Sequence, residues 1–114
     1  MGGRGGSGRS SAAVVQLPAV DANTLADMDI RDAMEDVVNI TGQSSPWVSL
    51  QRLRTTLSTR GWDTERQDQE LTRFVSQGKG RLLAEEDPGL LTKELRRAKL
   101  AFGDDNYHLL RLSN

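Results

Sequence analysis

The sequence predicts an α+β domain in which a three-helix core packs against a small antiparallel sheet. Three segments repeat apolar residues at helical spacing, and each segment ends near a glycine, at Gly42, Gly61 and Gly78. Two short apolar pairs, Leu82-Leu83 and Leu109-Leu110, lie beside turn-forming residues and predict strands. The chain has 114 residues, of which 36% are hydrophobic, so it can build one core.

Residues 1–22 predict a flexible Gly/Ser/Arg-rich tail, and residues 23–114 predict the folded domain. Five of the first eight residues are glycine, and the tail has no aromatic residue and too few apolar groups to offset its ordering entropy. Its longest apolar run, from Ala12 to Val15, is shorter than a membrane span or a secretory signal requires. We therefore expect a cytoplasmic protein that does not use a membrane.

The first predicted helix begins at Asn23 or Thr24, either of which can act as its cap, and ends at Gly42. Its apolar residues approximate one buried face: Leu25, Met28, Ala33, Met34, Val37 and Val38. Residues 21–45 hold six acids and one base, so this part of the surface repels phosphate.

The next segment predicts a short strand and two helices. Pro46 favours an extended approach at Trp47-Val48, and Ser49 is the expected cap of a helix that buries Leu50, Leu53 and Leu57. The third helix begins at Asp63 or Thr64, where Thr64 and Gln67 have the spacing of a capping box. Its expected buried side is Leu71, Phe74 and Val75.

The C-terminal part alternates strands, turns and one short helix. Residues 81–85 predict a strand, residues 86–89 a turn, and Thr92 the cap of a helix that continues to Lys99. After a turn at residues 103–106, residues 107–112 predict another strand. We expect Leu82-Leu83 to pair antiparallel with Leu109-Leu110, and Val48 to add a third strand at one edge.

In this order, the elements resemble a winged helix-turn-helix domain over about residues 24 to 112. The resemblance is carried by Trp47-Val48-Ser49-Leu50, by the Asp63-Thr64 start of the third helix, and by Arg81-Leu82-Leu83. It implies that the third helix enters the DNA major groove and that the hairpin between the last two strands touches the flanking backbone. The connection of residues 86–106 is longer than a simple wing and contains its own helix.

The resemblance and the charge distribution together predict a DNA-binding module for transcriptional regulation, with double-stranded DNA as its partner. Residues 46–81 include seven basic and four acidic residues, which gives a local net charge of +3. Arginine and glutamine on the third helix are types that pair with base edges, and further basic residues would support them on the backbone. The candidate residues are Arg52, Arg54, Arg66, Gln69, Arg73, Gln77, Lys79, Arg81, Arg96 and Arg97. Contact with four to six phosphates would give a log–log salt slope of about −4 to −5.

Two other interpretations stay open at this stage. The charges of the third helix also suit a solvated surface with ion pairs three or four residues apart. The alternative function is a protein–protein interaction module of the same fold, which would bind a protein partner or a second copy without nucleic acid. Its contact surfaces would be the acidic first helix and the region of Trp62, although Trp62 also suits a core position between the second and third helices.

Enzyme chemistry has little support in the sequence. The chain has no cysteine and one histidine, which excludes disulfides, thiolate catalysis, cysteine zinc sites and histidine metal clusters. His108 lies on the same side of its predicted strand as Leu110 and Leu112, where we expect a hydrogen-bonded histidine at the margin of the core. We expect a non-enzymatic protein with no cofactor and no metal.

Overall fold

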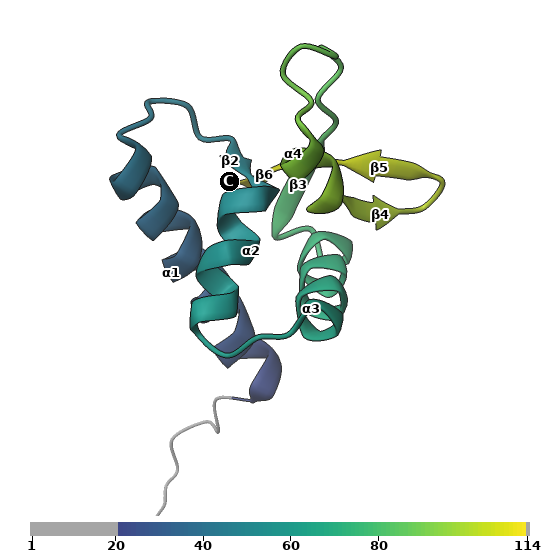
Figure 1. The fold of residues 1–114 in the computed structure, drawn as a ribbon. Coiled ribbons are helices and arrows are strands. Elements are labelled where there is room, and N and C mark those ends of the chain that lie inside the picture. Colours follow the sequence, from purple (N-terminus) through teal and green to yellow (C-terminus); the bar gives the residue numbers. More distant parts are fainter. Residues whose placement is uncertain (1–20, 114) are drawn as a thin grey trace, which may run out of the picture.

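The computed structural model describes residues 21–113 and confirms the α+β class, with helices packed on a small antiparallel sheet (Figure 1). The predicted tail lies outside the described residues except for its last two positions. The elements in chain order are α1 (Ala22–Thr41), β2 (Val48–Ser49), α2 (Leu50–Thr59), α3 (Thr64–Ser76), β3 (Gly80–Leu83), α4 (Lys93–Arg97), β4 (Leu100–Phe102), β5 (Asp105–Tyr107) and β6 (Leu109–Leu112).

Helix α1 covers one side of the core. Its cap is Asp21, whose Oδ1 accepts a hydrogen bond from the Thr24 amide at 2.8 Å, so the predicted cap at Asn23 or Thr24 is wrong by two or three residues. The helix ends as predicted at Gly42, which adopts the left-handed conformation with a φ of 66°. Its buried residues are Ala26, Asp27, Ile30, Ala33, Met34 and Val37.

Helices α2 and α3 meet over Trp62, which is 2% exposed, so its predicted core position is confirmed. Asp63 caps α3 by accepting a hydrogen bond from the Arg66 amide at 2.8 Å. The predicted capping box of Thr64 and Gln67 is wrong, because the Gln67 side chain is buried and bonds elsewhere. Ser49 precedes α2 as expected, but its side chain makes no capping hydrogen bond.

The main sheet has the strand order β2-β6-β3, and both pairs are antiparallel. Leu110 lies between Val48 and Leu82 in the registers, which confirms the predicted pairing and places β2 at the edge. Gly80 opens β3 against the core, where an added Cβ would lie 2.9 Å from Phe74 Cε2. Only glycine therefore lets β3 approach α3 this closely.

The connection between β3 and β6 contains more structure than the sequence analysis predicted. The short helix is confirmed as α4, and the Thr92 side chain caps it. Residues 107–112 do not form one strand, because Tyr107 belongs to β5 and β6 begins at Leu109. Strands β4 and β5 form a separate hairpin that projects beside α3 (Figure 1).

Candidate nucleic-acid interface

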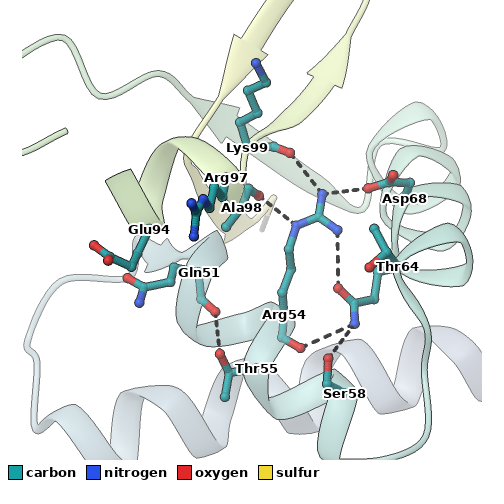
Figure 2. Close-up of a pocket in the computed structure, with 11 residues that line it drawn as sticks. Gln51, Arg54, Thr55, Ser58, Thr64, Asp68, Glu94, Arg97, Ala98 and Lys99 are labelled. Carbon is teal, nitrogen blue, oxygen red and sulfur yellow. Dashed lines mark hydrogen bonds and ion pairs between the residues drawn. The ribbon is translucent and has the colours of Figure 1, made fainter. Parts of the chain in front are cut away.

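Arg54 is the residue that joins α2 to the rest of the candidate surface. Its side chain is 12% exposed and its guanidinium donates to Asp68 of α3 at 2.6 Å and to the Gln67 side chain at 3.2 Å. It also donates to the carbonyls of Ala98 at 2.7 Å and Lys99 at 3.0 Å (Figure 2). These bonds use its donors inside the protein and hold α2, α3 and the start of β4 together.

Gln67 completes this network, and the sequence analysis did not identify it as a buried polar residue. Its amide nitrogen donates to the Trp62 carbonyl at 2.9 Å and to Ser58 Oγ at 3.0 Å. Its spacing in the sequence indicates burial, because Gln67 lies four residues before Leu71 and seven before Phe74 on the same helical face. A buried glutamine at that position requires partners for its amide.

Arg73 and Lys79 are also held by an internal contact, at the buried Asp27 of α1. Arg73 donates to Asp27 Oδ1 at 2.8 Å, and Lys79 forms an ion pair with the other oxygen. Arg73 further contacts Glu70 at 2.7 Å and the Gln77 side chain at 3.0 Å. Three of the candidate DNA-binding side chains, Arg73, Gln77 and Lys79, thus take part in attaching α3 and the following turn to α1.

The pKa values of this cluster follow from its geometry. Burial opposes ionisation of Asp27, but the hydrogen bonds and positive charges of Lys79 and Arg73 outweigh it and hold the pKa of Asp27 below its ordinary value of 3.8. Burial likewise opposes the charge of Arg73, but the hydrogen bonds that it donates to the carboxylates of Asp27 and Glu70 raise the pKa of this guanidinium. Asp27 and Arg73 are therefore charged near neutral pH.

Arg66 and Gln69 remain on the exposed surface of α3. The Arg66 guanidinium lies over the Trp62 ring, 4.2 Å from its centroid. Stacking uses one face of the planar group and leaves its N–H edges directed into solvent, while it restricts the side chain to one region. Thr72 and Ser76 follow Gln69 at helical spacing and Glu65 precedes it by four residues, so this face is polar with one carboxylate in the first turn of the helix.

A groove of about 390 Å³ separates this helix from α4 and the outer side of α2 (Figure 2). The hydroxyl groups of Thr55, Ser58 and Thr64 lie along it, and Arg97 enters from α4. Lys99 directs its carbonyl toward Arg54 and its ammonium group away from the groove. The other residues that line it are Gln51, Arg54, Gln67, Asp68, Glu94 and Ala98.

The remaining candidates lie in three different places. Arg52 lies on the flank of α2 that faces α1, where it lines a separate cavity with Val37 and Ile40. Arg96 is exposed on α4 next to Arg97. Arg81 lies on β3, opposite Arg111 of β6. The exposed candidates Arg66 and Gln69 thus lie on α3, and Arg96 and Arg97 lie on α4. Arg52 and Arg81 lie in two other parts of the surface.

His108 lies where the sequence predicted, at the margin of the core, and is 7% exposed. Its Nδ1 accepts a hydrogen bond from the Glu85 amide at 3.0 Å. Burial lowers the pKa of His108 below its ordinary value of 6.5, Glu85 opposes this and Lys99 adds to it. The imidazole is therefore neutral at pH 7.

Among residues 21–113, no group of three or more His, Cys, Asp or Glu side chains is arranged to hold a metal ion. No helix in this part of the chain combines the length and apolar character that a membrane span requires. Comparison with protein-family models, curated proteins and solved structures finds no match for this chain.

Proposed function

We propose that this chain is a non-enzymatic module that binds double-stranded DNA through α3 and α4 and acts in transcriptional regulation. The observation that carries the proposal is the Arg54 network. It neutralises Asp68 beside the groove and fixes the end of α4 against α3, so that two sequence-distant basic segments form one surface.

The charges on this surface suit a polyanion. Arg66, Arg96, Arg97 and Lys99 form no ion pair among residues 21–113, whereas Asp68 is paired with Arg54. Glu65 and Glu94 are the acids of α3 and α4 that oppose them, which leaves a local excess of positive charge. Basic side chains at the edge of a polar helix face are arranged to contact phosphates on both sides of a groove.

The polar side chains that follow Glu65 on this face of α3 suit the bases themselves. Gln69 can pair with an adenine edge, and Thr72 and Ser76 can donate to or accept from either base of a pair. This assignment agrees with the resemblance of the chain to winged helix-turn-helix domains, in which the third helix enters the major groove. Arg54, Arg73 and Lys79 are left out of the proposed contacts because their donors are used within the protein.

The test is a titration of a fluorescently labelled 20-base-pair duplex with the wild-type chain and with Arg97→Ala/Lys99→Ala. The double variant removes two exposed charges and is expected to weaken binding at least about tenfold. A matched control is Arg31→Ala/Arg52→Ala, which removes two exposed arginines on α1 and α2. Equal affinity for both double variants, or no binding by the wild type at low salt, would exclude the proposed surface.

A second candidate function, a protein-interaction module, is favoured by the exposed apolar side chains of α1. Leu25 is 52% exposed and Met28 53%, and both lie on the acidic helix that repels phosphate. Trp62 is buried and takes no part in this candidate. Light scattering over a range of concentrations tests for a homodimer, which Leu25→Ser/Met28→Ser is expected to dissociate.

A further inference from the structure

Three side chains form a row across the face of the main sheet that points away from the core. In the antiparallel register, Arg81 of β3 lies directly opposite Arg111 of β6. Val48 lies opposite Leu110, so Trp47 is adjacent to Arg111 on the other side. The Arg111 guanidinium is 5.6 Å from the centroid of the Trp47 ring. We call Trp47, Arg111 and Arg81 the arginine row.

The arginine row lies on the outer face because the alternate residues of each strand face the core. Val48 is 1% exposed and Leu110 0%, and Leu82 packs against the same cluster. Successive side chains of a strand point to opposite faces, so their neighbours Trp47, Arg111 and Arg81 point outward. Arg81 is exposed, and Trp47 and Arg111 are partly exposed.

Two like charges opposite each other in a sheet are unfavourable. Asp32 and Glu35 of α1 line a cavity together with Arg111, but neither forms an ion pair with it. Cross-strand pairs of like charge destabilise the sheet unless a counter-charge is present. Four basic side chains among residues 21–113 form ion pairs, namely Arg54, Arg60, Arg73 and Lys79. Neither arginine of the row is one of them. Arg111 donates from Nε to the Leu112 carbonyl at 3.2 Å, so its terminal nitrogens and the Arg81 guanidinium are the groups that could bind an external anion.

The neighbouring row on the same face holds Ser49, Leu109 and Leu83. Leu83 of β3 lies opposite Leu109 of β6, and Leu83 is 42% exposed. These two leucines and Trp47 thus lie on the same face as the two arginines. Aromatic and apolar side chains next to paired arginines suit unstacked bases joined by phosphates, whereas a duplex keeps its bases inside the helix.

We propose that this outer sheet face binds a nucleic-acid single strand, with a phosphate between Arg81 and Arg111 and bases stacked on Trp47 and on Leu83 with Leu109. This site is separate from the surface of α3 and α4, because the two share no residue. A strand opened from a duplex would be held here while the duplex is held by α3. The single-strand site does not depend on the duplex site and is tested on its own.

The experiment measures the anisotropy of a labelled 15-nucleotide oligo-dT with four forms of the full chain at 50 mM NaCl. Arg81→Ala/Arg111→Ala is expected to weaken single-strand binding more than tenfold while duplex affinity changes less than about twofold. Arg97→Ala/Lys99→Ala is expected to show the reverse pattern. Trp47→Leu is expected to weaken single-strand binding by about five- to a hundredfold, since stacking on an aromatic ring is lost.

Thermal unfolding provides an independent readout of the like-charge contact. Arg81→Thr is expected to raise the melting temperature by roughly 1–5 °C at low salt, and by less at high salt, because repulsion is removed. The same melting experiment on Arg81→Ala/Arg111→Ala shows that the variant used in the binding test folds. Unchanged oligo-dT affinity in Arg81→Ala/Arg111→Ala would overturn the proposal. Equal competition by a poly-glutamate peptide of matched length would also overturn it, since the face would then fit an acidic protein.

Discussion

At the scale of single residues, Asp27 makes the contact on which the position of α3 most depends. It lies inside α1 with a side chain that is 9% exposed, and it binds both Arg73 and Lys79. A buried carboxylate is retained only when its charge is paired and its oxygens accept hydrogen bonds. Asp27 therefore links α1 to both ends of the segment that leads from α3 into β3.

Replacing Asp27 with asparagine is expected to lower the free energy of unfolding by about 1–3 kcal/mol, because Arg73 and Lys79 lose their shared counter-charge. Urea denaturation of Asp27→Asn measures this loss. Asp36→Asn is the control, since the ion pair of Asp36 with Arg60 has side chains 51% and 28% exposed and is expected to contribute less than about 1 kcal/mol. Equal losses in the two variants would contradict the role given to Asp27.

The same contact predicts a pH dependence of stability. The pKa of Asp27 is lower in the folded chain than its ordinary value of 3.8, so the folded state favours the ionised carboxylate. Its contribution is fully present above about pH 4 and is lost as the pH falls through the lower folded value. The difference in unfolding free energy between the wild type and Asp27→Asn should shrink as the pH falls below about 4.

Arg54 and Arg52 test the same residue type in two environments. Arg54→Lys is expected to cost about 2 kcal/mol, because lysine cannot reproduce the planar contacts with Asp68, Gln67 and two carbonyls. Arg52→Lys retains charge at an exposed position and is expected to change stability by less than about 0.5 kcal/mol. Denaturation of both variants measures the contrast, and a neutral Arg54→Lys would exclude the network as a structural link.

At the scale of elements, the two helix caps next to the candidate surface differ in a way that is measurable. Asp63 accepts a hydrogen bond from the Arg66 amide, whereas the Ser49 side chain makes no capping bond. Asp63→Ala is therefore expected to lower the unfolding free energy by about 1 kcal/mol, and Ser49→Ala by much less. Thermal unfolding of the pair checks this, and the opposite order would be inconsistent with the capping geometry.

The elements that could be predicted from the sequence are those with local signals. Gly42 ends α1, and Thr92 caps α4. The apolar pairs of β3 and β6 form hydrogen-bonded neighbours, because the sequence offers few other strands. The sequence did not predict the hairpin of β4 and β5. Leu100 is its one fully buried side chain, and Asp105-Asn106 are residue types typical of a turn. Short strands without apolar alternation carry little signal in the sequence.

The candidate site was harder to predict than the fold, because contacts with residues distant in the sequence determine which of its charged side chains are ion-paired. Nothing near Arg73 in the sequence indicates that its guanidinium donates a hydrogen bond to Asp27, which lies 46 residues away. Arg54 similarly bonds to carbonyls 44 and 45 residues further along the chain. Helical spacing predicted that Leu71 and Phe74 of α3 are buried, but only the packing of the elements shows which basic side chains are used internally.

At the scale of the whole molecule, the net charge of −1 conceals an uneven distribution. Residues 21–45 carry −5 and residues 46–81 carry +3, so α1 is acidic while the segment of α2, α3 and β3 is basic. Internal ion pairs then use Arg54, Arg60, Arg73 and Lys79 of the basic segment. The proposal that remains assigns duplex DNA to α3 and α4, and leaves the acidic helix facing away from phosphate.

The most direct test of that proposal is the salt dependence of duplex binding. If Arg66, Arg96, Arg97 and Lys99 each neutralise one phosphate, a plot of log affinity against log salt has a slope of about −3.6, and Arg97→Ala/Lys99→Ala reduces its magnitude by about 1.8. Arg31→Ala/Arg52→Ala leaves the slope unchanged. A slope near zero, or one that both double variants reduce equally, would contradict the account.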